Sequence, residues 1–337
     1  RYWKAMEKDA MLEAIQQAGV VGMGGATFPA HIKLKPAKPI DVLIINGAEC
    51  EPYLTADYRL MLEEADRLVT GVQILKKVLA VKKCYIGIED NKPRAIESMK
   101  KAFQDIEGVE VAGLKTKYPQ GAEKMLIKVL TGREVPCGGL PMDVGAVVQN
   151  MGTAAAIAHA VVKGVPITER ITTVSGDAIR EPNNLRLRIG TTYREAIRYC
   201  GGFKEEPDKL LAGGPMMGMA QFTMDVPVMK GSSGILGLTK KVTAHGDESP
   251  CIRCGRCVQA CPMGLIPSML SILSERHDFA SAKDDYGLFN CVECGCCTYT
   301  CPAKRNIVQY IKHAKAECKA QMARDKAKAA KKQGAGK

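Results

Sequence analysis

The stretches "CIRCGRCVQACP" at residues 251–262 and "CVECGCCTYTCP" at residues 291–302 repeat one pattern of cysteines. In each stretch three cysteines are separated by two residues, and a fourth follows after three more residues and precedes a proline. Nine of the 14 cysteines of the chain fall between residues 251 and 301. Clustering of this kind favours metal binding in a reducing compartment over the disulfides of a small secreted domain.

The spacing of these cysteines indicates which metal they bind. In two-cluster ferredoxins the three thiolates of C-x2-C-x2-C hold one [4Fe-4S] cube, and the fourth cysteine of each run crosses to the other cube. The first predicted ligand set is Cys251, Cys254, Cys257 and Cys301. The second predicted set is Cys291, Cys294, Cys297 and Cys261. Structural zinc is the alternative, although such sites typically use two separated C-x2-C pairs.

The segment between the two runs has apolar residues at helical spacing and no alternating strands, which predicts a helical ferredoxin domain. Cys296 lies inside the second run and fits neither ligand set. We interpret it as a spare thiol near the cluster, with ligand exchange as the alternative. The scattered cysteines are predicted to be structural, and they are Cys50, Cys84, Cys137, Cys200 and Cys318.

Length and composition limit the possible classes of protein. A chain of 337 residues exceeds the usual size of a single core, so two or three domains are expected. The content of 46% hydrophobic and 25% charged residues is ordinary for a globular protein. No run approaches the roughly 18 apolar residues of a membrane span. The most apolar stretch, residues 145–164, is predicted to be a buried helix preceded by a loop.

The net charge of +12 is concentrated at the C-terminal end, where residues 312–337 carry nine Lys and Arg against two acidic residues. A run of this kind predicts a solvated tail or a frayed helix, with docking on an anionic membrane surface or an acidic partner as the alternative. Because the run lacks interleaved aromatic residues and no nucleic-acid motif occurs elsewhere, nucleic acid is not an expected partner.

Two stretches of the N-terminal half suggest a ligand site. In "GVVGMGGATFPAHIK" (19–33) a loop with Gly22, Gly24 and Gly25 follows a predicted helix, whereas the dinucleotide fingerprint requires a preceding strand. By itself such a loop is equally well explained as a tight turn. In "IDVLIINGAECEP" (40–52) a buried strand ends at Asn46 and leads to two carboxylates, where open α/β sheets place their ligands.

Strands and helices then alternate along the chain. Helices are predicted over 62–80, 92–103 and 122–131, and strands over 84–89 and 109–114. This order predicts a parallel sheet with helices on its faces. Residues 170–245 contain short alternating strands and a helix opened by Thr191 and Thr192, which favours a small β-grasp domain. We interpret "GGPMMG" (213–218) as a turn in a spacer without a catalytic role, with a ligand-facing loop as the alternative.

These residues resemble a known family. The glycine loop resembles the G-x-G-G-A-x-F-P-x-x-x-K pattern of the FMN- and NADH-binding subunit of respiratory complex I and its relatives, and "NGAECEP" (46–52) is similar to N-x-x-E-x-E-P. Together with the ferredoxin runs, the chain resembles the C subunits of Rnf-type ferredoxin:NAD oxidoreductases over nearly its whole length. The family often has Asp where this chain has Ala48. Cobalamin reductases of bacterial microcompartments share this layout and remain an alternative.

The resemblance implies roles for individual residues. The residues implied in binding FMN and the nucleotide are Gly22, Gly24, Gly25, Phe28, Lys33, Asn46, Gly121, Glu123, Lys124 and Asn150. Phe28 would stack on the nicotinamide nucleotide, and Glu49 and Glu51 would line the NADH pocket beside the flavin as the catalytic pair. Plainer interpretations are a solvated strand end for the two glutamates and a helix cap for Asn150.

The resemblance also implies an architecture and a function. It implies a multidomain α/β chain with a Rossmann-like FMN and NADH domain (1–168), a β-grasp domain (169–245), a helical ferredoxin domain with two [4Fe-4S] clusters (246–315) and a basic tail (316–337). Electrons would pass between NAD(H), non-covalent FMN and the clusters. The implied partners are the other subunits of an ion-translocating complex and, indirectly, ferredoxin. The implied location is peripheral, at the cytoplasmic face of the membrane. A passive two-cluster scaffold is the competing interpretation.

Overall fold

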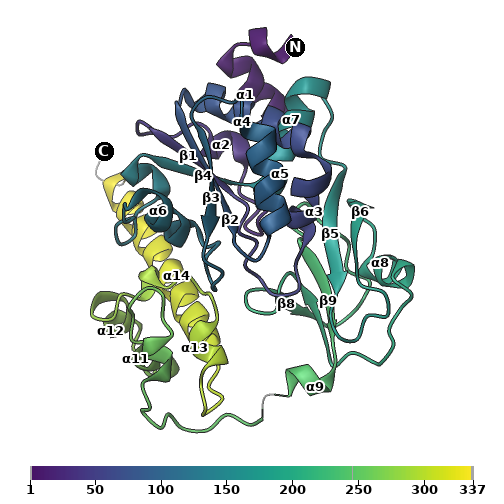
Figure 1. Ribbon diagram of the computed structural model, residues 1–337. Coiled ribbons are helices and arrows are strands. Elements are labelled where there is room, and N and C mark those ends of the chain that lie inside the picture. The colour runs from purple at the N-terminus through teal and green to yellow at the C-terminus, as the bar shows by residue number, and fades with distance from the viewer. Residues whose placement is uncertain (1, 245, 335–337) are drawn as a thin grey trace. The chain divides into compact units, whose positions relative to one another are not determined.

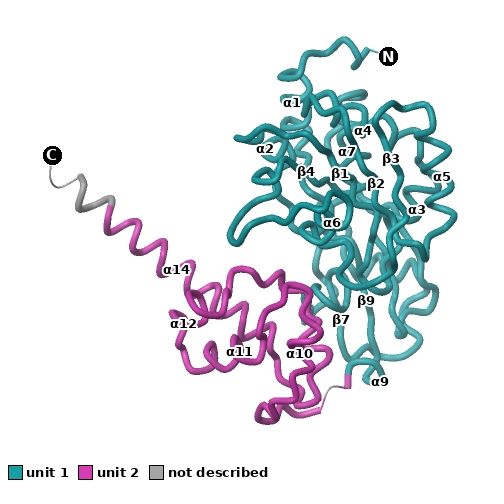
Figure 2. The backbone as a smooth tube through the Cα atoms, turned by 60° about the vertical axis from the view of Figure 1, so that its left-hand side comes forward, with its two compact units in different colours: residues 1–243 teal, residues 244–337 magenta. Residues whose placement is uncertain are grey.

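The computed structural model describes residues 2–244 and 246–334, and the chain divides into two compact units, Arg1–Thr243 and Ala244–Lys337 (Figure 2). The first unit contains two sheets, and the described part of the second is built from helices (Figure 1). Each unit has a hydrophobic core of its own. Within the described residues, no helix is both long enough and apolar enough to cross a membrane.

Four parallel strands form the first sheet, in the order β3-β2-β1-β4 (Figure 2). They are β1 (Val42–Asn46), β2 (Lys83–Glu89), β3 (Val109–Leu114) and β4 (Ala146–Asn150). Successive side chains of β1 point to opposite faces, so Leu43 and Ile45 join a large core on one face while Val42 and Ile44 join a smaller core on the other. Burial of both faces explains why the strand is a continuous apolar run.

Helices cover both faces of this sheet. The helices that contribute to the large core are α1 (Lys8–Gln17), α3 (Ala56–Glu63), α4 (Ala65–Leu79), α5 (Pro93–Phe103) and α7 (Met151–Lys163). The smaller core is covered by α6 (Glu123–Thr131). Short elements of the connections are η1 (Tyr2–Ala5), α2 (Ala30–Lys33) and η2 (Pro141–Val144). The layers are those that the alternation of strands and helices predicts.

Two predicted elements differ from the structure. The stretch 145–164 is not a loop and a helix, because residues 146–150 form strand β4 beside β1 before α7 begins. A short apolar run has no periodicity that separates a buried strand from a helix, and Asn150, which caps α7, sets the boundary. The predicted helix 62–80 corresponds to α4, which begins only at Ala65 because Glu64 leaves helical geometry at φ −129° and ψ 37°, and the preceding helix α3 is not predicted from the sequence.

The second sheet has five strands, β5 (Glu169–Ser175), β6 (Asn183–Arg188), β7 (Lys209–Ala212), β8 (Met219–Gln221) and β9 (Gly234–Leu238). Their order is β6-β5-β9-β7-β8, with β5 and β9 parallel and the other pairs antiparallel. Helix α8 (Tyr193–Tyr199) begins as predicted, because Thr192 and Glu195 form a capping box. The short helix α9 (Lys240–Thr243) ends the first unit.

The second unit is helical, as predicted. Its elements are α10 (Arg256–Gln259), α11 (Pro267–Glu275), α12 (Phe279–Asp284), η3 (Leu288–Asn290), α13 (Cys296–Tyr299) and α14 (Ile307–Gly334). Both cysteine runs include a short helix, α10 or α13, and the loops before and after it. Helix α14 passes without a break from the ferredoxin-like part into the basic stretch, so the described residues 316–334 continue a helix rather than forming a separate element.

The packing of α4 on α7 depends on Gly71. A Cβ atom at this position would lie 2.0 Å from the carbonyl oxygen of Ala154, a backbone atom that cannot rotate away. Although alanine favours a helix by about 1 kcal/mol over glycine, we expect Gly71→Ala to lower the free energy of unfolding by about 1–3 kcal/mol because the helices must separate. Urea unfolding measures this change. Gln73→Ala, at a half-buried position of the same helix, is the control and is expected to change stability by less than about 0.5 kcal/mol.

Candidate functional site

The half-buried carboxylate of Glu49 stands at the start of α3. Its two oxygens accept hydrogen bonds from the backbone nitrogens of Asp57, at 2.8 Å, and Tyr58, at 2.9 Å. Burial raises the pKa of Glu49 from its ordinary value of 4.5 to about 8, and the charge of Asp57 adds to this rise. The two hydrogen bonds and the ammonium group of Lys92 act in the opposite direction. Glu49 is therefore an inward-facing group rather than a solvated strand end.

Asp57, which is also half-buried, is the second member of this acidic pair. Burial raises its pKa, while a hydrogen bond from the Asn150 side chain and the charges of Arg170 and Lys92 oppose the rise. The Asn150 amide nitrogen donates to Asp57, and its oxygen accepts from Thr153 N at 3.3 Å, which caps α7. Asn150 thus has the capping role of the plain interpretation and also ties α7 to the acidic pair.

Glu51 joins the two sheets of the first unit. One oxygen accepts a hydrogen bond from Met216 N at 3.1 Å, and the other accepts from the Tyr118 hydroxyl at 3.3 Å. Burial raises the pKa of Glu51, and hydrogen bonds from Met216, Met217 and Tyr118 oppose this. Met216 belongs to the "GGPMMG" loop, so this loop contacts Glu51, although none of its residues lines the cavity beside that carboxylate. A Cβ atom on Gly214 would lie only 2.1 Å from the Glu51 oxygen.

A cavity of about 480 Å³ opens beside these carboxylates, at the carboxyl ends of β1, β2 and β3. It is lined by residues 49–55 and by Tyr58, Glu89, Asn91, Lys92, Thr116, Lys117 and Tyr118. Its volume suits a small-molecule ligand. Tyrosine rings can stack on a base, carboxylates accept hydrogen bonds from ribose hydroxyls, and lysines attract phosphate, so the lining suits a nucleotide.

Lys92 fixes the floor of this cavity. Its ammonium group donates to the carbonyl oxygen of Ala48 at 2.9 Å and pairs with Glu89 at 3.3 Å. The side chains of Lys92 and Glu89 are only 10% and 3% exposed, so the pair is shielded from water. These contacts hold the chain after β1 against the end of β2. Sequence reasoning missed Lys92, because nothing in its immediate surroundings marks it as different from a surface lysine.

The glycine loop lies over the start of α7. It is closed by a hydrogen bond from Gly22 N to Phe28 O at 2.8 Å, and Met23 N donates to Thr153 Oγ1 at 2.9 Å. A Cβ atom on Gly24 would lie 3.5 Å from Asn150 Cβ, while Gly25 has a positive φ of 111° that favours glycine. The rest of the loop surface is exposed, and Phe28, 50% exposed, does not line the 480 Å³ cavity.

Arg170 anchors this loop from the second sheet. The guanidinium group is buried and donates to Met23 O at 3.3 Å and to Lys230 O at 2.6 Å. Burial lowers the pKa of Arg170 to about 10, although Asp57 and Glu49 favour its charged form. The sequence offers no signal for this role, since Arg170 stands in an ordinary strand.

The remaining predicted residues form two contacts. Asn46 donates to the carbonyl oxygen of Gly121 at 2.8 Å, and Gly121 N donates to Cys50 Sγ at 3.2 Å. Lys33 forms an ion pair with Glu123 at 2.5 Å, which joins α2 to α6. Lys124 follows Glu123 in α6, is half-buried and takes part in none of these contacts.

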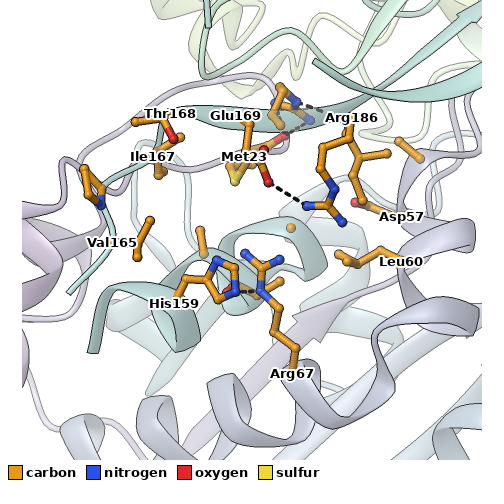
Figure 3. A pocket seen from close by; sticks show the side chains of 17 residues that line it. Met23, Asp57, Leu60, Arg67, His159, Val165, Ile167, Thr168, Glu169 and Arg186 are labelled. Carbon is orange, nitrogen blue, oxygen red and sulfur yellow. Dashed lines mark hydrogen bonds and ion pairs between the residues drawn. The ribbon is translucent and has the colours of Figure 1, made fainter. Parts of the chain in front are cut away.

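A second cavity of about 250 Å³ lies among α3, α7 and the start of β5 (Figure 3). Its lining includes Arg67, His159, Arg170 and Arg186, and Figure 3 shows Arg67 beside His159. The guanidinium groups already have protein partners, such as the ion pair of Arg67 with Glu64 at 2.6 Å. None of the predicted site residues lines this cavity, and we assign it no ligand.

The second unit contains two small cavities lined by cysteines. One is lined by Cys251, Cys254, Cys257 and Cys301, and the other by Cys261, Cys291, Cys294 and Cys297 together with Cys296. These are the two sets that the spacing predicts, including the exchange of the fourth cysteine between the runs. Within the described residues, no group of three or more His, Cys, Asp or Glu side chains is placed to hold a single metal ion.

The backbone of both runs fits iron–sulfur cubes. Arg253 and Glu293 have positive φ of 56° and 58°, and Gly255 and Gly295 have 74° and 85°, so both loops adopt one conformation. Left-handed residues in such loops turn backbone N–H groups toward the interior. Glu293 N accordingly donates to Cys291 Sγ at 3.3 Å. In iron–sulfur sites, hydrogen bonds of this kind to ligand sulfurs contribute to the reduction potential.

Family models match all three parts of the chain. A model described as "Nuo51 FMN-binding domain" matches residues 15–159, one described as "SLBB domain" matches 171–220, and one described as "4Fe-4S dicluster domain" matches 250–305. An FMN-binding domain and a dicluster domain in one chain define an iron–sulfur flavoprotein of the oxidoreductase class.

Curated relatives narrow this class. The chain is 64% identical over 330 residues to the C subunit of the proton-translocating ferredoxin:NAD(+) oxidoreductase complex of Clostridium ljungdahlii, with 97% of this chain and 72% of the relative covered. It is 49% identical to the C subunit of the Na(+)-translocating ferredoxin:NAD(+) oxidoreductase complex of Acetobacterium woodii, covering 94% and 72%. The C subunit of the ion-translocating oxidoreductase complex of Rhodobacter capsulatus is 49% identical, covering 80% and 52%. The chain belongs to this family of C subunits.

A solved structure shares the fold. A chain of an NAD+-reducing [NiFe]-hydrogenase in the H2-reduced state superposes with a TM-score of 0.67 at 18% identity, covering 90% of this chain and 63% of that chain. A chain of such a hydrogenase in the air-oxidised state superposes with a TM-score of 0.63 at 17% identity, again covering 90% of this chain and 63% of that chain. At these identities the likeness shows the fold alone.

The raised pKa of Glu49 leads to a prediction for stability against pH. Because the folded protein holds this proton more tightly than the unfolded chain, the contribution of Glu49 to stability is complete below about pH 4.5 and falls as the pH rises through 8. For one proton, the free energy of unfolding changes by at most about 1.4 kcal/mol per pH unit. The Glu49→Gln variant should lack this part of the pH dependence of the free energy of unfolding. Calorimetric unfolding at pH 5 to 9 tests it, with Glu110→Gln, an exposed residue of β3, as the control.

The close approach of Gly214 to Glu51 leads to a second prediction. The added methyl group of Gly214→Ala would overlap Glu51 as far back as its Cβ atom, at 2.7 Å, so the loop or the glutamate must move. We expect a loss of about 1–3 kcal/mol in the free energy of unfolding in urea. Gly113→Ala in β3, whose Cβ would meet Ile96 at an ordinary 3.6 Å, is the matched control. Equal stability of the two variants would contradict the contact.

Proposed function

We propose that this chain is an electron-transfer subunit of a ferredoxin:NAD oxidoreductase complex and passes electrons between NAD(H), FMN and two [4Fe-4S] clusters. The observation that carries the proposal is the 480 Å³ cavity at the carboxyl edge of the parallel sheet, bordered by Glu49 and Glu51, in a chain that also holds a dicluster domain. The curated relatives carry the same activity in their names. We further interpret residues 1–168 as a Rossmann-like domain, 169–245 as a β-grasp domain and 246–315 as a helical ferredoxin domain.

The residues around the first sheet fit FMN. Bound FMN would convert a two-electron hydride donor into a source of single electrons. Gly22, Gly24 and Gly25 give the loop a surface without side chains that a planar ring can approach, and the site is completed by Lys33, Asn46, Gly121, Glu123, Lys124 and Asn150. The Lys33 and Glu123 pair, 31% and 38% exposed, provides a cation and an anion near the loop.

The residues of the large cavity fit a nicotinamide nucleotide. Donors from both sheets hold Glu51, so its carboxylate is oriented before a ligand arrives. Its remaining lone pairs can accept hydrogen bonds from ribose hydroxyls. Phe28, on the exposed glycine loop, is free to stack on a ring that enters from solvent. Glu49, whose pKa is about 8, contributes a group that can hold a proton at the wall of the cavity.

The cysteine sets are the proposed cluster ligands, and clusters held in this way would carry single electrons. We propose that the other subunits of an ion-translocating complex are the partners, that ferredoxin donates indirectly, and that the chain is peripheral at the cytoplasmic face of the membrane. The basic end of α14 is suited to anionic surroundings. A cobalamin-reductase-like role shares the same sites and differs only in the partner.

An anaerobic NADH titration of the reconstituted chain tests the proposal. We expect NADH to bleach the flavin absorbance and to produce reduced-cluster EPR signals. Glu51→Gln should raise the NADH concentration at half-reduction about tenfold, the loss of roughly one hydrogen bond to a charged group, while Glu110→Gln should not. If no flavin is retained and dithionite alone reduces the clusters, the chain is a passive two-cluster carrier.

A further inference from the structure

The two cysteine runs form an internal repeat whose polar residues differ. Position 251 corresponds to 291, and the correspondence continues through Pro262 and Pro302. The left-handed residues coincide as well, since Gly264 (φ 64°) is matched by Lys304 (φ 55°). The next position is Leu265 in the first copy and Arg305 in the second. The repeat therefore supplies its own comparison, with the same backbone and a different side chain.

Leu265 and Arg305 line different cysteine cavities. Leu265 faces the cavity of Cys261 and the second run, whose other non-cysteine lining is apolar, glycine or proline. Arg305 faces the cavity of Cys251, Cys254, Cys257 and Cys301, together with Arg253 and Ser268. One cavity therefore has cationic and hydroxyl groups in its wall, and the other has none in its described lining.

The Arg305 side chain is nearly inaccessible to solvent, with 7% exposed. Its terminal nitrogens pair with Glu275 at 2.7 Å and with Glu248 at 3.6 Å, and the guanidinium carbon lies 5.2 Å from the ring centroid of Tyr310. The Nε atom is different, because it is buried and has no hydrogen-bond partner among the described residues. A buried N–H group without a partner is costly, so a group bound in the adjoining cavity is the expected acceptor.

The chemistry of an iron–sulfur cube supplies that acceptor. Thiolate and sulfide sulfurs are anionic, and reduction adds a further negative charge. An N–H donor and a buried cation therefore favour the reduced form and raise the potential. Glu275, 48% exposed, and Glu248, 27% exposed, offset the charge only in part, because water screens them better than Arg305.

The other cavity has a nearby cation of its own, Lys315. This side chain is 10% exposed, but it donates to the Cys291 carbonyl oxygen at 2.6 Å and pairs with Glu293 at 2.7 Å. Lys315 pairs with one carboxylate and Arg305 with two, so charge balance alone does not favour Arg305. The difference is one of position, because the described hydrogen bonds of Lys315 go to protein oxygens and Lys315 does not line the cavity.

The cysteines of this second cavity also accept backbone hydrogen bonds. Glu293 N donates to Cys291 Sγ at 3.3 Å, and Leu265 N donates to Cys261 Sγ at 3.4 Å. These donors are neutral, whereas a guanidinium N–H is charged and forms a stronger hydrogen bond, so the asymmetry in side-chain charge between the two cavity walls remains.

We infer that Arg305 is a positioning residue that donates its Nε–H to the cluster held by Cys251, Cys254, Cys257 and Cys301, and that this makes this cluster the one with the higher reduction potential. At equilibrium the first electron then resides on this cluster, and the cluster of the second run takes the second electron. This order deepens the proposed function, but a titration with mediators reads the two potentials without NADH.

The test is an EPR-monitored redox titration of the reconstituted full chain with dye mediators. We expect two reduction steps. Arg305→Leu introduces the residue of the other repeat. It should lower the midpoint potential of the higher-potential step by about 59 mV, which is a tenfold change in the equilibrium constant for one electron. The potential of the other step should not change. Arg305→Lys keeps a charge but lacks Nε–H, so a smaller decrease is expected.

Two further variants separate tuning from structural support. Glu275→Gln removes a carboxylate that offsets Arg305, so it should shift the higher step upward, opposite to Arg305→Leu. Arg276→Leu removes an exposed arginine that lines neither cavity and should shift neither step. If the ion pair only supports the structure, Glu275→Gln and Arg305→Leu should shift the midpoint potential in the same direction.

Several results would overturn the inference. One is an unchanged higher step in a fully loaded Arg305→Leu protein, and another is a shift confined to the lower step. If Arg305→Leu does not retain its iron, Arg305→Lys and Glu275→Gln decide the matter by the sign of their shifts. A chain that NADH cannot reduce would contradict the proposed function. The order of potentials would still be measurable, because the dye mediators replace NADH as the electron source.

Discussion

A carboxylate that leaves water must be surrounded by hydrogen-bond donors, and the segment after β1 buries two of them. Glu49 takes its donors from the start of α3, inside its own sheet domain. Glu51 takes donors from Tyr118 and from a loop of the second sheet. The chain between these residues is thereby fixed from two sides, and it forms one wall of the 480 Å³ cavity.

The sequence predicts those parts of the sites whose chemistry is local. Cysteine ligands must recur at fixed spacing to surround a cube, so both sets are visible in the sequence, and the structure gathers the same residues around two cavities. The connections that follow parallel strands meet at one edge of the sheet, which places Asn46, at the end of β1, near Gly121 in the connection between β3 and α6. Whether these residues bind FMN and nucleotide stays a prediction.

The residues that the sequence does not reveal act through distant contacts. Met216 and Arg170 reach partners more than 100 positions away, and neither stands in a motif. Gly214 looks like a turn residue, although its lack of a side chain is required by a neighbouring carboxylate. Strand β4 is missed for another reason, because a five-residue buried strand has no period of its own. Arg305 is visible only when one repeat is compared with the other.

The contact of Arg170 with both Met23 and Lys230 has a consequence for how such chains are assembled in evolution and in the laboratory. Most of the second sheet lies within residues 171–220, which match a family model of their own. Here it supplies Arg170, which holds the glycine loop, and the loop that donates a hydrogen bond to Glu51. A domain taken from another protein would therefore need an arginine at the position of Arg170 and a glycine at the position of Gly214. Exchange of the second sheet alone would remove these contacts.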